Sequence, residues 1–297
     1  MWKTNEMPAL TGKTAIVTGS NSGIGFESAK AIALKGAHVV MAVRNLEKGN
    51  AAMERIRQQV KDASIEVMQL DLANLASVKS FAQAFKKSHK QLDLLINNAG
   101  VMVPPKRMET EDGFELQFGT NHLGHFALTG QLLDLILKTP GSRIVNVSST
   151  AHWMGKMDFE NINADKSYVK WVAYGNSKVS NLLFTRELQR RLEAAGKETI
   201  VLAAHPGWTA TELQRYTGST RFMNKFLAMK PWQGALPTLY AATVAPNGHD
   251  FFGPDGFMEM RGYPKPARSS SLSNDAEVAK KLWDLSEKLT GVSFSFA

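Results

Sequence analysis

Tyr174 and Lys178 lie four positions apart in the run Tyr-Gly-Asn-Ser-Lys at 174–178, a spacing that brings both side chains to one face of a helix. A free tyrosine has a pKa of about 10 and is a poor acid at neutral pH. A cation beside the phenol favours the phenolate, lowers that pKa and makes proton exchange feasible near pH 7. Ser149, from an upstream segment, could hold the oxygen that receives the proton. The same spacing also fits an exposed pair on any long helix, so the rest of the chain must decide.

The elements that would position these side chains alternate between β-branched runs and amphipathic stretches, a pattern that predicts a mainly parallel sheet with helices on both faces. The expected strands are Thr14–Thr18, His38–Val43, Glu66–Leu70, Leu92–Ile96, Arg143–Val147 and Thr199–Ala204, with a weaker seventh at Phe257–Met260. The expected helices are Ile24–Lys35, Leu46–Lys61, Leu75–Ser88, Glu111–Leu137 with a possible break, Tyr168–Glu193 and Asp275–Leu289. No repeat or linker interrupts this order, which predicts one doubly wound α/β domain over residues 1–297 with a Rossmann-type sheet of about seven strands.

Composition excludes several classes of function. The chain has 297 residues and no cysteine, so disulfides, thiolate metal sites and cysteine nucleophiles are absent. The net charge of +8 is spread over separate helices, as in Lys86–Lys87 and Arg190–Arg191, which indicates solvated helix faces rather than a nucleic-acid surface. No apolar run approaches the ~18–20 residues of a membrane span, and the start at Met1–Glu6 lacks the apolar stretch of a secretory signal. We therefore expect a cytoplasmic protein.

A glycine-rich turn follows the first expected strand and opens the first expected helix, with the sequence Thr-Gly-Ser-Asn-Ser-Gly-Ile-Gly at 18–25. Gly19 permits the sharp turn, Gly23 lets the backbone approach a pyrophosphate, and Gly25 allows close packing of helix on strand. The helix N-terminus offers unpaired N–H groups to phosphate oxygens. The strand–turn–helix context favours a dinucleotide site over a plain turn.

The spacing Gly-x-x-x-Gly-x-Gly, Asn97-Asn98-Ala99-Gly100 after the fourth strand, Ser149 and the Tyr174–Lys178 pair occur in the order typical of one family. Together they resemble the short-chain dehydrogenase/reductase family over residues 12–212. The resemblance implies a cofactor-binding and catalytic core at 12–205. It also implies contacts to a nicotinamide dinucleotide from Gly19, Ser20, Asn21, Ser22, Gly23, Ile24, Gly25, Asp71, Leu72, Asn98, Ala99, Gly100, Tyr174, Lys178, Pro206, Gly207, Thr209 and Thr211. Asp71 would approach the adenine, although it also suits a helix cap or a turn.

Arg44 favours NADP(H) over NAD(H). The second strand ends in Val43-Arg44-Asn45 with no carboxylate before Glu47, so the acid that would bind a ribose 2′-hydroxyl is missing. A guanidinium at this point can pair with a 2′-phosphate, with Ser20 and Asn21 adding hydrogen bonds. The alternative is a surface arginine that starts a helix.

The resemblance also implies four catalytic residues. Tyr174 would exchange a proton with the substrate oxygen, Lys178 would lower the pKa of Tyr174 and bind the nicotinamide ribose, and Ser149 would polarise the substrate oxygen. Alternation along the fifth strand favours Ser149 over Ser148. Asn121 would kink its helix and hold a water beside the lysine, or would be a buried helical asparagine with no part in catalysis. Metal-ligand spacing is missing around four histidines, and we expect no metal in this chemistry: His122, His125, His152 and His205.

Two segments, 151–170 and 208–232, interrupt the alternation and are rich in aromatic and Met side chains. They predict an apolar lid on a hydrophobic substrate cleft, or equally side chains packed on the body or in a subunit contact. Three sequence features resemble the retinol-dehydrogenase-like branch: the sequence of residues 145–152, the long gap before Tyr174, and Val43-Arg44-Asn45. That branch implies a lipophilic aldehyde, ketone or alcohol as substrate, for which we expect a carbonyl reductase or alcohol dehydrogenase without a membrane anchor.

Three questions stay open from the sequence. Members of the family often pair through the helix that carries the tyrosine, so a homo-oligomer, dimer or tetramer, is one expectation. A non-catalytic NADP(H)-binding regulator is an alternative function, because a Rossmann-type fold does not by itself imply turnover. A nucleotide-sugar epimerase or dehydratase also uses Tyr-x-x-x-Lys, but its relatives favour another glycine spacing and a longer C-terminal domain.

Overall fold

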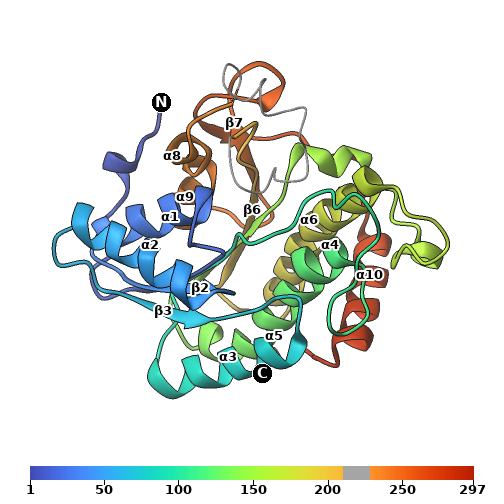
Figure 1. The fold of residues 1–297 in the computed structure, drawn as a ribbon, viewed down its shortest axis with the longest axis horizontal. Coiled ribbons are helices and arrows are strands. Elements are labelled where there is room, and N and C mark those ends of the chain that lie inside the picture. Colours follow the sequence, from blue (N-terminus) through green and yellow to red (C-terminus); the bar gives the residue numbers. More distant parts are fainter. Residues whose placement is uncertain (210–227) are drawn as a thin grey trace.

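The computed structural model describes residues 1–209 and 228–297, which form one α/β domain around an eight-stranded sheet (Figure 1). The strand order is β3-β2-β1-β4-β5-β6-β7-β8, the doubly wound order with its switch point between β1 and β4. Neighbouring strands are parallel up to β7, and β8 pairs antiparallel with β7. The bounds are β1 Thr14–Thr18, β2 His38–Val43, β3 Ile65–Gln69, β4 Leu94–Asn97, β5 Arg143–Val147, β6 Ile200–Ala204, β7 Phe251–Pro254 and β8 Pro264–Pro266.

Helices cover both faces of this sheet, and each face has its own apolar core. One layer contains α1 (Gly23–Leu34), α2 (Leu46–Gln59), α8 (Pro231–Gly234) and α9 (Leu236–Thr243). The other contains α3 (Leu75–Ser88), α5 (Gly124–Leu137), α6 (Lys170–Ala194) and α10 (Ala276–Thr290). Strands buried on both sides explain the nearly continuous apolar runs from which they were predicted.

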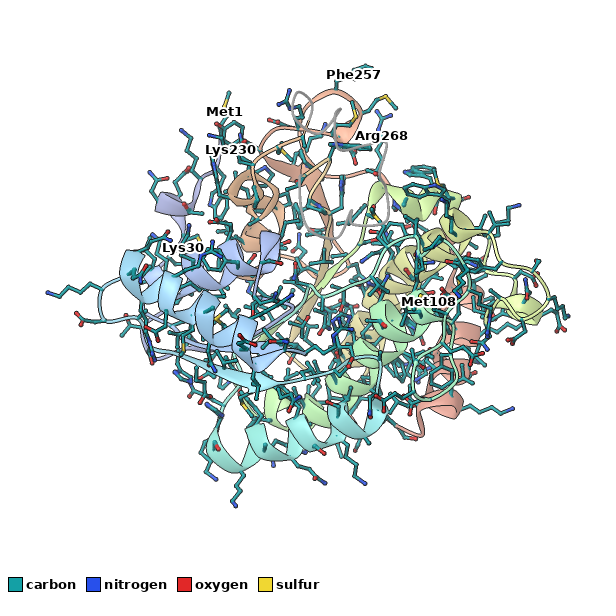
Figure 2. The ribbon with its side chains drawn as sticks, viewed as in Figure 1. Met1, Lys30, Met108, Lys230, Phe257 and Arg268 are labelled. Carbon is teal, nitrogen blue, oxygen red and sulfur yellow. The ribbon has the colours of Figure 1, made fainter. Side chains whose placement is uncertain are left out.

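The structure confirms the predicted fold class and the first six strands to within two residues at either end, but the weak seventh strand is wrong. Phe257–Glu259 forms a 3₁₀ turn, and the seventh strand is β7, which ends at Pro254. Met258 has a φ of 50°, a left-handed conformation that no strand residue adopts. Phe257, labelled in Figure 2, projects from the molecule and is 81% exposed, so its apolar character does not report a buried strand.

Helix α6, which carries Tyr174 and Lys178, is an interior helix. Every residue from Ala173 to Thr185 is buried, and α10 packs along it. Behind α10 the chain ends in a short tail, residues 291–297, in which Phe294 lies against Trp283 with ring centroids 4.5 Å apart and against Phe126 at 4.8 Å. Own-chain segments therefore cover the side of α6 that faces away from the sheet.

Asn74 caps α3, since its side chain accepts a hydrogen bond from the Ser77 backbone N–H at 2.9 Å. Within the described ranges, 1–209 and 228–297, no helix combines the length and the apolar character that crossing a membrane requires.

Candidate active site

Tyr174, Lys178 and Ser149 meet beyond the carboxyl end of β5. This strand ends at Val147, and α6 packs beside it with Tyr174 and Lys178 buried on the side of the strand end. The Lys178 ammonium donates a hydrogen bond to the Val147 carbonyl at 3.0 Å and lies 5.7 Å from the centre of the Tyr174 ring. The Ser149 side chain lies close enough to the Tyr174 hydroxyl to lower the pKa of that phenol. The structure thus brings together the three side chains that the sequence analysis grouped.

The two neighbouring serines after β5 differ in their surroundings. Ser148 is buried, and its hydroxyl donates to the Lys178 carbonyl at 2.8 Å. Ser149 is half-buried, and its side chain accepts from the Ala151 backbone N–H at 3.1 Å as well as contacting Tyr174. His152 fixes the backbone here, because its Nδ1 donates to the Ser149 carbonyl at 2.7 Å and its Nε2 accepts from the Ser270 N–H. Only Ser149 therefore presents its hydroxyl to the tyrosine.

Burial, not the neighbouring cation, dominates the titration of the pair. Burial raises the pKa of Tyr174 to about 12, and the nearby Ser149 hydroxyl lowers it by less. Burial also lowers the pKa of Lys178 to about 8. The expectation that Lys178 depresses the pKa of Tyr174 is therefore not met in the protein alone. In this state Tyr174 is a neutral proton donor at pH 7, because the desolvation of the phenolate outweighs the distant ammonium.

Asn121 lies in a π-helical turn, Gly119–Leu123, between the short helix α4 (Leu116–Phe118) and α5. Its side chain is clamped to Val101, accepting from the N–H at 2.7 Å and donating to the carbonyl at 2.9 Å. A Cβ on Gly100 would stand 3.0 Å from the Asn121 Oδ1 and 3.7 Å from the Lys178 Nζ. The predicted helix break is thus a π-turn, typical of functional sites, and Asn121 and Lys178 flank one glycine.

His125 joins the catalytic group to the glycine turn, a connection that the sequence analysis missed. Its Nδ1 lies 3.0 Å from the Asn121 carbonyl and its Nε2 lies 2.9 Å from the Thr18 hydroxyl. Burial lowers the pKa of His125 to about 4, so the ring is neutral at pH 7, with its proton on Nδ1 facing the carbonyl. The position of His125 one helical turn after Asn121 was the available signal, since residues four apart share a face.

The glycine turn connects β1 to α1 and has the features of an anion site. Gly19 has a φ of 66°, and a Cβ there would lie 2.9 Å from Ala99, so only glycine fits. The Ser20 hydroxyl is buried and has no hydrogen-bond partner in the described parts of the chain. Ser22 begins α1 without a side-chain cap, which leaves the first N–H groups of the helix available. An orphaned hydroxyl beside an uncapped helix start fits a dinucleotide phosphate.

The other expected cofactor residues lie around this turn or further along the same sheet edge. The Asn98 amide donates to the Thr18 carbonyl at 2.8 Å, so its side chain holds the β4 loop on the turn. Asp71 forms a turn, accepting from the Ala73 N–H at 2.9 Å, and Leu72 is buried. Arg44 is exposed at the end of β2 and makes no hydrogen bond or ion pair with the described residues.

The loop after β6 contains Pro206, Gly207 and Thr209. Gly207 has a φ of 62°, and the Thr209 hydroxyl donates to the Pro206 carbonyl at 2.8 Å. Thr211 lies outside the described residues, as does most of the expected lid segment 208–232. The apolar side chains of the described segment 151–170 differ in burial. Met157 packs in the core with α6, whereas Trp153 and Met154 are 58% and 50% exposed. Packing on the body therefore accounts for part of this segment.

The strand order and the glycine turn at its switch point place the protein among the Rossmann-type oxidoreductases. The sequence pattern of short chain dehydrogenases matches residues 13–221. The chain is 40% identical to retinol dehydrogenase 11 of Homo sapiens over 95% of its length and 87% of that protein, and 41% identical to human retinol dehydrogenase 13 over 95% and 86%. It belongs to the short-chain dehydrogenase family, in the retinol-dehydrogenase-like branch, which confirms the resemblance seen in the sequence.

Solved structures agree with this assignment. An uncharacterized protein from Mycobacterium paratuberculosis is 42% identical and superposes with a TM-score of 0.84 over 99% of both chains. A short chain dehydrogenase of Shigella flexneri, solved in complex with NADP, superposes with a TM-score of 0.68 at 22% identity over 83% of this chain and 98% of that chain. The second likeness shows the fold alone.

Proposed function

We propose that this protein is an NADP(H)-dependent carbonyl reductase or alcohol dehydrogenase that acts on hydrophobic ketones, aldehydes or the corresponding alcohols. The observation that carries the proposal is the contact of Ser149 with the Tyr174 hydroxyl beside the buried Lys178. An intact group of this kind also argues against a non-catalytic NADP(H)-binding regulator.

In this proposal the residues of the chain bind, orient and protonate the substrate. The bound cofactor supplies the hydride that reduces the carbonyl carbon. Ser149 donates a hydrogen bond to the carbonyl oxygen, and Tyr174 gives that oxygen its proton, as a phenol with a pKa of about 12 remains protonated at pH 7. Lys178, fixed by Val147, provides the positive charge that stabilises the resulting phenolate. His125 links the Asn121 carbonyl to the Thr18 hydroxyl and so fixes α5 relative to the glycine turn.

The preference for NADP(H) rests on Arg44. It stands exposed and without an acidic partner among the described residues, at the end of the strand that neighbours β1. A guanidinium there can form charge-assisted hydrogen bonds with a 2′-phosphate. The Ser20 hydroxyl, in the glycine turn after β1, has no hydrogen-bond partner among the described residues and would add a hydrogen bond to the cofactor.

A hydrophobic substrate is proposed from two facts. Two relatives that match 95% of this chain are named for retinol, an apolar alcohol. In this chain Trp153 and Met154 expose large apolar surfaces only a few residues after Ser149. We assign segments 151–170 and 208–232 to a substrate lobe and the core at 12–205 to the cofactor and the chemistry.

Tyr174→Phe tests the mechanism. Without the hydroxyl no proton reaches the substrate oxygen, so we expect kcat with hydrophobic ketones to fall by at least ~10³-fold, while the Kd for NADPH stays within about twofold. NADPH absorbance measures turnover, and fluorescence titration measures binding.

Tyr240→Phe is the matched control for this test. Tyr240 lies on α9, where its ring packs against Trp2 and Phe252, so turnover should survive. Activity of Tyr174→Phe equal to that of the unchanged protein would refute the mechanism. NADPH binding by the unchanged protein without turnover on any ketone, aldehyde or alcohol of the panel would favour the regulator.

Arg44→Ala tests the nucleotide. Loss of the 2′-phosphate contact should lower kcat/KM with NADPH by ~10–100-fold and leave kcat/KM with NADH nearly unchanged. Arg57→Ala is the control, because Arg57 on α2 pairs with Glu54 on the surface. Equal use of both nucleotides before and after the Arg44 change would contradict the assignment.

A further inference from the structure

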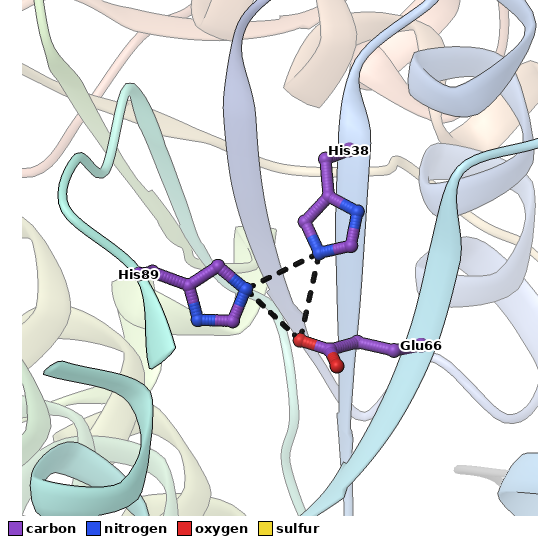
Figure 3. A group of neighbouring side chains, drawn as sticks. All are labelled: His38, Glu66 and His89. Carbon is purple, nitrogen blue, oxygen red and sulfur yellow. Dashed lines mark hydrogen bonds and ion pairs between the residues drawn. The ribbon is translucent and has the colours of Figure 1, made fainter. Parts of the chain in front are cut away.

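Two histidines and a glutamate from distant parts of the sequence converge at the edge of the sheet (Figure 3). His38 begins β2, Glu66 is the second residue of β3, and His89 follows the last residue of α3. The two Nε2 atoms are 3.3 Å apart. The Glu66 Oε1 lies 3.0 Å from the His89 Nε2 and 3.5 Å from the His38 Nε2.

The other ring nitrogen of each histidine is already engaged. The His89 Nδ1 lies 3.2 Å from the Phe85 carbonyl, which can only accept, so this nitrogen carries the proton. The His38 Nδ1 lies 2.8 Å from the Ser64 hydroxyl. The Glu66 Oε1 is buried and accepts no hydrogen bond from the residues described. The His89 Nε2 and the Glu66 Oε1 therefore present lone pairs to each other. The His38 Nε2 presents a third when the Ser64 hydroxyl accepts the proton of the His38 Nδ1.

We propose that His38, Glu66 and His89 bind a divalent metal ion of the zinc class. Ligand atoms around tetrahedral Zn²⁺ with bonds of ~2.1 Å are about 3.4 Å apart, close to the 3.0–3.5 Å between these three atoms. Each imidazole is oriented by a hydroxyl or a carbonyl on its far nitrogen, the usual outer partners of zinc-bound histidine. Phe85 stacks on the His89 ring at 4.3 Å between centroids, which holds this ligand in place.

The position indicates a structural role. The three residues stand toward the amino ends of β2 and β3, whereas the glycine turn and Ser149 follow the carboxyl ends of their strands. The metal therefore lies at the edge opposite the proposed chemistry. It would join the edge strand β3 to β2 and to the end of α3. Glu66 remains 41% exposed in its side chain, so solvent water can complete the coordination.

The experiment is a titration of the full chain with ZnCl₂ after treatment with a chelator. We expect one equivalent to bind by calorimetry, the melting temperature to rise with Zn²⁺ concentration, and Mg²⁺ at the same concentration to have no effect because it prefers oxygen ligands. Co²⁺ in place of Zn²⁺ should give the strong visible absorption of a tetrahedral site.

Variants identify the ligands. His89→Ala and Glu66→Gln should each weaken Zn²⁺ binding by more than ~100-fold, and Ser64→Ala by ~10–100-fold through loss of an outer partner. His249→Ala is the control, because His249 pairs with Glu193 on the surface at 3.2 Å, outside the described cluster. Circular dichroism verifies that each variant is folded.

Two results would overturn the proposal. One is Zn²⁺ binding that is equally tight in folded His89→Ala, in Glu66→Gln and in the unchanged protein. The other is a melting temperature of the unchanged protein that Zn²⁺ leaves where it was.

Discussion

Lys178 is a charged group held where a charge is costly. Burial lowers its pKa from 10.5 to about 8, so the folded protein disfavours the ammonium relative to the unfolded chain. The unfolded chain consequently binds more protons between pH 8 and 10.5, and the free energy of unfolding rises with pH in that window. Below pH 8 Lys178 is charged in the folded protein, and the full free-energy cost of burying its ammonium is present. The residue that we propose stabilises charge in the reaction thus destabilises the protein alone, a common compromise at functional sites.

Lys178→Met should make the nucleotide-free protein more stable at pH 7. The buried charge disappears, and the Val147 carbonyl keeps a donor in the Asn181 amide at 3.1 Å. We expect the melting temperature to rise by about 2–5 °C, for a gain on the order of 1–3 kcal/mol, and turnover to be lost. The difference from the unchanged protein should shrink as pH rises from 8 to 10.5, with the exposed Lys87→Met as control. A lower melting temperature at pH 7 would contradict this account.

At the residue level, motif spacing predicted which side chains meet but not their energetics. The helical period places Tyr174 beside Lys178, and the end of β5 places Ser149 near them. Both are local properties of the sequence. The rise in the pKa of Tyr174 depends on how completely α6 is buried, which comes from packing against Thr150–Met154, α4 and α10. His38, Glu66 and His89 have no shared spacing at all, and only the strand register brings them together.

At the level of elements, the first six strands and the helices beside them were predictable because each has a clear period and a turn at either end. The C-terminal elements were not. The weak seventh strand was placed on an exposed turn, since Phe257 and Met258 are apolar without being buried. The aromatic tail after α10 gave no periodic signal, yet Phe294 contacts Trp283, Phe126 and Phe184.

Phe294→Ala should therefore destabilise the protein, although only three residues follow Phe294 in the sequence. Its ring fills the space between α5 and α10, and a Cβ on Gly130 would already stand 2.7 Å from it. We expect a loss of about 2–3 kcal/mol in urea denaturation, below the ~3–5 kcal/mol of a fully buried phenylalanine. The exposed neighbour Ser295→Ala should have no effect. Equal stability of both variants would show that the tail does not pack in solution.

On the scale of the whole molecule, the two edges of the sheet differ in chemistry. The carboxyl edge collects the glycine turn, the Asn98 loop, Ser149 and the Gly207 loop, which is where open α/β sheets bind their ligands. The amino ends of β2 and β3 collect His38 and Glu66 instead. A change at the proposed metal site can therefore alter stability without affecting the proposed hydride-transfer site.

The covering of α6 by α10 and the aromatic tail bears on how copies of the chain assemble. Members of this family often pair by packing the tyrosine-bearing helices of two subunits together, and such a bundle needs an accessible apolar stripe on that helix. Here the stripe is occupied from within the same polypeptide. We expect light scattering on the eluted protein to give the 32.7 kDa of a single chain. A dimer mass would contradict this expectation. In that case α10 and the tail would have to leave α6 before the tyrosine-bearing helix of a second subunit could pack there, so the tail and the partner helix would compete for one surface.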